Sequence, residues 1–446
     1  MDLTALNDPD LLLGLWRGTI KCYEPDMRDS WDWKVLVGKV WETHGVTVAM
    51  ATPYIPSSFG RVPRNPAEKI NTGYKAWEYL LYIFGLGPAL LRSILPEKYW
   101  LNYCKFVRGI HLLYQLKLSP EHIQEGHRLL CEFHLRFEGL YVQRRADRIH
   151  FLRHSIHLLT HIAPETIRAG PLSCYAQWIM ETAIGNLGDE IRQDKDPYAN
   201  IAQRGVLRAQ INSIVAMMPH VLLSERDATR IPHGARDLGE GYILLQACQP
   251  TAIDVSGPEA DAIMALWEAK GWPNKDRWPR AVRRWARLRL PNGQLARSCW
   301  NESRSLGNLR RTTVVKVSYT FCAVDCSIFA EVQYFFRLTF GDEVHSLAVV
   351  SVFSSPDCNL LHQSFQTVYA CHYQGANALL AIDIKQIQSV VSMIPYFKVT
   401  PDGELKTPET EYFLMEKMGL DVTLLLGEEE EDEGPDEDDM YADELR

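Results

Sequence analysis

The hydrophobic period changes near the middle of the chain, and this change constrains the fold more than any single motif. From Ala67 to about Met218, apolar residues recur every three or four positions, which is typical of amphipathic helices. After Trp300 the period becomes two, in segments rich in Val, Phe and Tyr: Val314–Phe321, Ile328–Phe340, His345–Phe353 and Phe365–Tyr373. The chain is therefore predicted to be α+β and multidomain, with an all-α helical block followed by a mostly antiparallel β-domain.

Local signals mark several boundaries within this plan. Ser119 can cap a helix that continues with Pro120 at its first position, and a last helix is expected at 203–218. Pro291-Asn292-Gly293 predicts a hairpin turn between WARLRL and QLARS, and Gly341-Asp342 predicts another. A chain of 446 residues exceeds one ordinary core. We expect a first segment at 1–50, the helical block at 51–220, a linker at 221–256, the β-domain at 257–426 and a disordered acidic tail at 427–446.

Charge is strongly separated along the chain, although the net value of −9 conceals it. The last twenty residues contain twelve acids and one arginine, so the tail carries −11 and leaves about +2 for the remainder. Between Lys270 and Lys316 there are thirteen Lys or Arg residues and only two acids. This separation favours a polyanion-binding face in the β-domain and a self-repelling tail.

The basic region contains the candidate nucleic-acid-binding residues, which are Arg283, Arg284, Trp285, Arg287, Arg289, Arg297, Arg310 and Arg311. In a strand over 285–290, the odd-numbered residues Trp285, Arg287 and Arg289 share one face and the even-numbered ones the other. Arginines pair with phosphates through two hydrogen bonds, and indoles stack on unpaired bases. The alternative interpretation is a solvated basic face with tryptophans in the core.

A stripe of imidazoles precedes Pro164. Residues 148–163 are predicted to form an amphipathic helix that Pro164 ends, and on such a helix four histidines fall within roughly 60° of one another: His150, His154, His157 and His161. Imidazoles four residues apart can share a metal ion. Alternatively, the rings hydrogen-bond to neighbouring backbone groups or line a half-buried seam, and metal binding by these residues is the weaker hypothesis.

Glu181 is the candidate catalytic carboxylate, on a second amphipathic run beside Trp178. A magnesium-dependent nuclease needs two or three carboxylates that converge on a pair of ions. One glutamate does not establish such a site, and Asp189 and Glu190 are competing candidates.

The sequence also predicts the compartment. The N-terminus lacks the basic start of a secretory signal, and no apolar run is long and pure enough to span a bilayer. The ten cysteines form no CxxC pair, which favours reduced thiols over a structural zinc site. We therefore expect a soluble intracellular protein without a membrane partner.

Several blocks of the chain resemble the En/Spm-type (CACTA) DNA transposase family in the form found in mushroom-type fungal genomes. The resemblance spans nearly the whole chain and is carried by GP-x6-W-x-M-E, IGNLGDEIRQ, NPAEKINTGYKAW, DLLLGLWRGTI, PSSFGRVPRNPAEK, LRSILPEKYWLNYCKFVRGIHLL, DPYANIAQR, WARLRLPNGQLARS and AEVQYFFRL. Most of these are family-specific strings and not catalytic signatures.

The resemblance implies a nuclear DNA transposase with an RNase H-like core, an acidic triad and two Mg²⁺ or Mn²⁺ ions. The helical block would be the insertion and end of that core, and residues 1–50 a remnant of it. Asp2 would match an aspartate of the family and Glu181 its closing glutamate. The family's Met-His pair after Asp2 is missing, and its zinc-binding module and first catalytic acid are expected to be absent, so the chain should be catalytically incomplete alone.

Three hypotheses for function follow. The first is a truncated transposase-family protein that binds DNA (the transposon ends in the family) or further transposase subunits, including copies of itself. The second is a host interaction protein on the same fold, whose acidic tail recruits basic partners. The third is a metal hydrolase that uses the histidine stripe.

Overall fold

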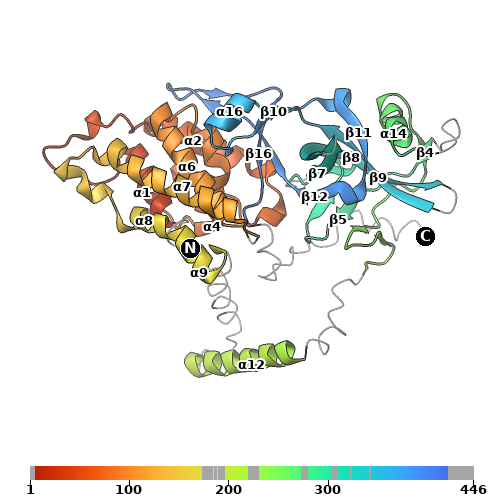
Figure 1. Cartoon of the computed structure of the whole chain (residues 1–446), viewed down its shortest axis with the longest axis horizontal. Helices are drawn as coiled ribbons and strands as arrows, with labels where there is room; N and C mark the ends of the chain where they lie inside the picture. The colour runs from red at the N-terminus through yellow and green to blue at the C-terminus, as the bar shows by residue number, and fades with distance from the viewer. Residues whose placement is uncertain are drawn as a thin grey trace.

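The computed structural model describes residues 6–172 except 116, and then 196–218, 231–272, 280–302, 310–321, 324–340 and 343–419, with the isolated positions 184 and 188. Figure 1 shows a helical block formed by the N-terminal part of the chain beside a β-domain formed by the C-terminal part. One helix, α12 (Pro197–Met217), lies apart from both and has no buried residue. The structure combines α-helices with antiparallel β-sheets, so the predicted α+β class is confirmed.

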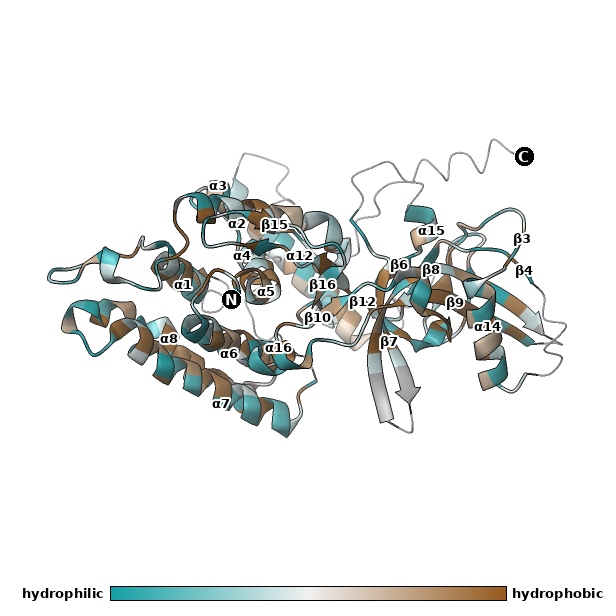
Figure 2. Cartoon of the chain, turned by 90° about the horizontal axis from the view of Figure 1, so that it is seen from above, coloured by the Kyte–Doolittle hydropathy of each residue, from teal (hydrophilic) through white to brown (hydrophobic). Residues whose placement is uncertain are grey.

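The helical block encloses a core rich in large aromatic side chains, among them Trp16, Trp33, Tyr82, Tyr103, Phe106 and Phe133. Hydrophobic and hydrophilic residues alternate along α6 and α7, which lets one face of each helix turn inward (Figure 2). The hydroxyl of Ser119 accepts a hydrogen bond from the backbone N–H of His122, so the predicted cap of α7 is confirmed. The helices of the block are α1 (Asp8–Arg17), α2 (Gly38–Met50), α3 (Pro66–Lys69), α4 (Ala76–Tyr79), the π-helical η5 (Leu80–Leu86), α5 (Gly87–Leu90), α6 (Glu97–Leu113), α7 (Pro120–Phe137), α8 (His154–Leu158) and α9 (Ile162–Ala169).

Two glycines let α6 and α7 approach each other closely. A Cβ atom on Gly109 of α6 would lie 2.7 Å from Cγ of Leu130, and one on Gly126 of α7 would lie 2.8 Å from Cγ of Leu113. Both separations are shorter than a van der Waals contact between carbons, so a larger residue at either position would require the facing leucine or its helix to shift. The sequence therefore fixes the distance between these two helices at two positions along their length.

The β-domain is a sandwich of two antiparallel sheets, with a helix on its outer face. The larger sheet has the strand order β11-β9-β8-β7-β12, and the smaller has the order β1-β2-β5-β6. The core between them draws on both sheets and includes Leu244, Leu288, Val332, Phe335 and Val350. Helix α14 (Pro258–Ala269) covers the opposite face of the larger sheet through Ile263 and Trp267.

The strands of the sandwich are β1 (Arg236–Asp237), β2 (Ile243–Leu244), β5 (Arg287–Arg289), β6 (Leu295–Arg297), β7 (Val314–Phe321), β8 (Val324–Phe340), β9 (Glu343–Val352), β11 (Leu379–Asp383) and β12 (Ile387–Val390). Two further strands, β3 (Ile253–Asp254) and β4 (Ala281–Val282), pair with each other beside it. Strands β8 and β9 pair in antiparallel register as far as Phe340 and Glu343, and the predicted turn at 341–342 lies outside the described residues.

A third sheet ties the β-domain to the helical block. Its order is β10-β16-β13, with β10 at Ala370–His372, β16 at Glu411–Met415 and β13 at Ser392–Pro395. Side chains of this sheet belong to the core of the helical block: Ile394, Phe413 and Met415. In addition, the Ser392 hydroxyl donates a hydrogen bond to the carbonyl of Tyr54, 2.6 Å away. The two bodies therefore share one packed boundary.

The predicted helix at 148–163 is wrong. The chain forms a 3₁₀ turn, η7 (Ala146–Phe151), then an extended step, and only then α8, another 3₁₀ turn (Leu159–His161) and α9. Pro164 does not end a helix but lies in the first turn of α9, where a missing N–H costs nothing. The break is explained by Arg148, whose side chain turns inward from η7 to a buried acid. Tertiary contact here outweighs the helical periodicity.

Two other expectations need correction. Residues 236–254 fall inside the predicted linker at 221–256, yet they supply β1, β2 and β3 of the β-domain. These strands have two residues each, which is too short to display a period of two. The predicted strand at 365–373 is reduced to β10, and α16 (Cys358–Gln363) precedes it.

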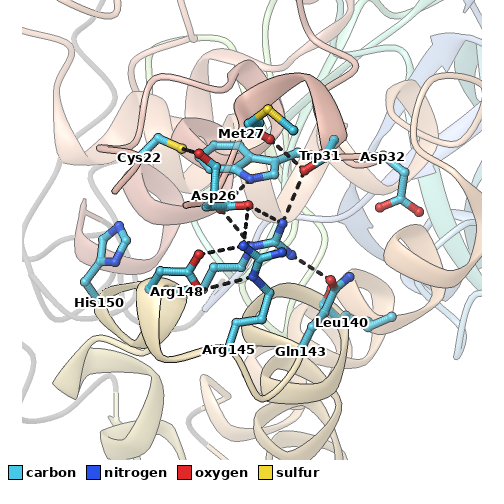
Figure 3. A network of polar contacts seen from close by, with 12 residues as sticks. Cys22, Asp26, Met27, Trp31, Asp32, Leu140, Gln143, Arg145, Arg148 and His150 are labelled. Carbon is cyan, nitrogen blue, oxygen red and sulfur yellow. Dashed lines mark hydrogen bonds and ion pairs between the residues drawn. The ribbon is translucent and has the colours of Figure 1, made fainter. Parts of the chain in front are cut away.

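The buried acid is Asp26, and it forms the polar network of Figure 3. The Arg148 guanidinium donates to both of its carboxylate oxygens, at 2.8 and 2.5 Å, and the Trp31 indole N–H donates at 2.8 Å. Both ionic side chains are almost fully buried, with 3% and 1% of their surface exposed. Burial favours the neutral acid, but these hydrogen bonds outweigh it and hold the pKa of Asp26 below its ordinary value.

Removal of one partner of this pair should strongly destabilise the protein. Asp26→Asn leaves the Arg148 charge buried without its counter-ion, so the free energy of unfolding should fall by roughly 3–5 kcal/mol. Asp29→Asn is the matched control, because Asp29 pairs with Lys34 at an exposed position and its loss should be undetectable. Urea denaturation followed by circular dichroism measures both. Equal stability of the two variants would contradict a buried, strongly coupled pair.

Candidate nucleic-acid interface

The β5–β6 hairpin presents part of the predicted basic set. The two strands pair antiparallel, with Arg287 directly opposite Arg297, so the predicted hairpin is confirmed. The even-numbered side chains of the first strand are buried as the alternation predicts: Ala286, Leu288 and Leu290. Arg287 and Arg289 are half-buried on the other side. The sheet therefore directs arginines from two neighbouring strands toward the same face.

Trp285 departs from the predicted pattern. Only 9% of its surface is exposed, and its ring belongs to the core between the two sheets. Its backbone pairs with Phe335 of the larger sheet, whereas Arg287 pairs with Arg297 of the smaller one. The alternation of a single strand does not continue through this change of partner. The indole is buried in the protein core and is not available to stack on a base. The prediction of Trp285 as a base-stacking residue is therefore wrong, and Trp285 is a core residue.

Arg284, Arg310 and Arg311 of the predicted set make side-chain contacts within the protein. Arg284 lies 3.1 Å from the carboxylate of Glu259 and stacks over Tyr334, with 4.5 Å to the ring centroid. Arg310 donates to the backbone carbonyls of the 53–60 loop, at 2.7 Å to Ile55 and 3.0 Å to Gly60. Arg311 stacks over Tyr54 in the same loop. These contacts hold the two bodies together or fix α14, which is a structural role for cations predicted to bind DNA.

The remaining members of the set are Arg283, Arg287, Arg289 and Arg297. Arg283 is exposed, and neither it nor Arg289 has an ion pair with a carboxylate among the residues the structure describes. Arg297 acts electrostatically on Glu302, where burial raises the pKa of the carboxyl and the guanidinium opposes that rise. The outward positive charge of this region therefore comes from Arg283 and Arg289, and not from the whole predicted set.

The four predicted histidines are divided by the break before α8. His150 lies on η7 and contacts the Lys21 carbonyl, with 2.7 Å from its Nε2. The other three lie together, with 3.1 Å between the Nε2 atoms of His157 and His161. The ring of His134 on α7 faces His157 at 5.8 Å between centroids. Over the described ranges, no group of three or more His, Cys, Asp or Glu residues could hold a metal ion.

The predicted catalytic acids lie outside the described residues. Asp2 precedes residue 6, and Glu181 falls in the gap between 172 and 196, together with Asp189 and Glu190.

The structure adds three charged residues that sequence reasoning missed. Two of them belong to the β-domain, Arg236 on β1 and Arg337 on β8. Arg337 has a recognisable signal, because it is a cation within the alternating apolar pattern of a long strand. Asp8 is fully buried at the start of α1. Its position in the first turn of a helix resembles an ordinary exposed acid, so the sequence offers no signal for its burial.

No protein-family model, curated protein or solved structure that was compared with the chain matches it. Among the described residues, none of the helices has the length and apolar character that crossing a membrane requires.

The buried Asp8 should make stability fall as pH rises toward neutrality. Burial raises its pKa to about 7, and nearby Ser155 and Arg153 only partly offset this. Between about pH 4 and pH 7 the folded state keeps a proton that the unfolded state releases. Asp8→Asn should remove this dependence, so it should gain roughly 2–4 kcal/mol of unfolding free energy relative to the parent between pH 4 and pH 8.

The matched control for this effect is Asp10→Asn, because Asp10 is exposed on the same helix. Urea denaturation at a series of pH values measures the stability of parent and both variants. A difference between Asp8→Asn and the parent that stays constant with pH would contradict the assignment.

Proposed function

We propose that the chain is a transposase-family protein of the En/Spm (CACTA) type and that its basic β-domain binds DNA. The recurring sequence blocks support the family, and they are also the support for an RNase H-like origin of the helical block. The proposal concerns binding and includes no cleavage step, because Asp2 and Glu181 lie outside the described residues. The nuclear location and the Mg²⁺ or Mn²⁺ requirement of the family belong to the same proposal.

The DNA-binding part of the proposal rests on one observation. Arginine is in local excess over acidic residues. The described residues from 280 to 316 include nine Lys or Arg residues and a single acid. Some of these cations are used internally, but Arg283 is exposed, and neither it nor Arg289 has an ion pair with a carboxylate among the described residues. Guanidinium groups pair with phosphate oxygens through two hydrogen bonds each, and solubility alone does not require so uneven a distribution of charge.

Loss of two hairpin arginines should weaken DNA binding and reduce its salt dependence. Each phosphate contact adds close to one unit to the slope of log affinity against log salt. Arg287→Ala with Arg289→Ala should therefore lower the magnitude of that slope by roughly one to two units. Fluorescence anisotropy with a short duplex over a salt series measures this, and thermal unfolding checks that the variant is folded.

The control removes the same charge from the helical block. Arg128→Ala with Arg168→Ala deletes two arginines that make exposed ion pairs on α7 and α9. If binding depends only on net charge, the two double variants will behave alike. If the β-domain binds DNA, only the hairpin variant will show a smaller slope. No binding by the parent at low salt would refute the proposed function.

The interaction-protein alternative draws support from the acidic tail. The tail could either recruit basic partners or compete with DNA for the basic face. Deletion of residues 427–446 distinguishes these two hypotheses. At physiological salt the Debye length is about 8 Å, but a tethered tail acts at roughly millimolar effective concentration and can reach the basic face. Deletion should tighten duplex binding several-fold at low salt, with a smaller difference at high salt. Unchanged affinity for DNA together with lost affinity for a polylysine probe would favour the interaction protein.

A further inference from the structure

Three arginines from separate elements meet at one open end of the β-sandwich. Strand β8 places Phe335 in the core between the sheets, and Arg337 follows two positions later on the same face. Trp285 and Phe335 exchange backbone hydrogen bonds, at 2.8 and 3.2 Å. In an antiparallel pair, a residue two positions before the bridge on one strand lies opposite the residue two positions after it on the other strand. Continuing the register of this bridge by two residues places Arg283 beside Arg337.

The third arginine approaches from the smaller sheet. Arg236 on β1 is paired with Leu244, which is paired in turn with Leu288. Residues directly opposite each other in a sheet point to the same side, and both leucines point into the core between the sheets. Arg236 thus faces the space between the sheets from the edge of the smaller one, toward the end where Arg337 leaves the core.

Electrostatic effects agree with this placement. Burial lowers the pKa of Arg337, and the positive charge of Arg236 lowers it further. Burial raises the pKa of the Cys248 thiol, while Arg283 and Arg236 both act against that rise. The charge of Arg236 therefore acts on Arg337, and the charges of Arg236 and Arg283 act together on Cys248.

The cluster lacks a counter-ion within the described part of the chain. None of Arg236, Arg283 and Arg337 forms an ion pair there, and Nε of Arg337 is buried without a hydrogen-bond partner. A buried donor left unsatisfied costs about 1–3 kcal/mol, and like charges add to that cost. Ser346, directly opposite Arg337 on β9, supplies a hydroxyl beside it. A bound oxyanion would satisfy these donors and neutralise the repulsion.

We propose that Arg236, Arg283 and Arg337 form an oxyanion site that holds a phosphate group, which in the complex with DNA is a backbone phosphodiester. The second part of this proposal rests on the proposed DNA-binding function. Guanidinium groups suit phosphate because each can donate two parallel hydrogen bonds to its oxygens, and three of them can surround a tetrahedral anion. The site would fix one phosphate at the end of the sandwich, while the hairpin arginines contact others.

The test uses the full chain with the variants Arg337→Gln and Arg283→Gln, and with Arg136→Gln as a control at an exposed position of α7. Thermal unfolding is followed while inorganic phosphate is added at constant ionic strength, with chloride as the reference anion. Phosphate should raise the melting temperature of the parent and the control in a saturable manner, and both site variants should lose that response. In chloride alone Arg337→Gln should melt no lower than the parent, because the substitution relieves repulsion.

A duplex-binding series over salt separates the two parts of the proposal. If the phosphate is a DNA phosphodiester, each site variant should lose about one unit of salt slope, while Arg136→Gln should not. A parent that responds to phosphate but does not bind duplex would refute the proposed function and leave a site for free phosphate. A parent that binds duplex, with site variants that match it in both assays, would refute the oxyanion site and leave DNA binding intact.

Discussion

The ion pair between Asp26 and Arg148 is the interaction on which the N-terminal body depends. It joins two segments more than a hundred residues apart, and it lies beneath the stacked indoles of Trp31 and Trp33. Two buried charges are favourable only if every strong donor and acceptor finds a partner. Asp26 meets this condition through Arg148 and Trp31, and Arg148 through a further bond to Gln143. The arrangement specifies which turn of the chain lies over the aromatic core.

That constraint also explains where sequence reasoning succeeded and where it failed. The cap at Ser119 and the hairpin after Leu290 were predictable because their signals lie within a few residues of the structure they create. The break at Leu152 was not, because its cause is an acid far away in the sequence. Strands of two residues, such as β1 and β2, carry no period at all. Local patterns therefore predicted the elements, but long-range pairing decided their ends.

The arginines of the candidate site show the same contrast between what the local sequence indicates and what long-range contacts decide. A dense run of cations correctly indicated a basic region, yet the sequence could not distinguish Arg310, which binds a loop of the helical block, from Arg289, which faces outward. The distinction depends on which carbonyls and carboxylates fold against each side chain. Trp285 is similar, because its burial follows from a change of pairing partner that no alternation pattern encodes. Charge density is readable from the sequence, whereas the use of each charge is not.

The third sheet has a consequence for how the protein is made. Phe413 and Met415 complete the core of the helical block, although α9, the last helix described in that block, ends some 240 residues earlier. A ribosome synthesises the N-terminal helices first, so their apolar faces stay open until the last strands emerge. At roughly 5–20 residues per second this interval lasts on the order of ten seconds to a minute. During that time the unfinished block exposes apolar surface of the kind that chaperones bind, and its native core closes only after the last strands have been made.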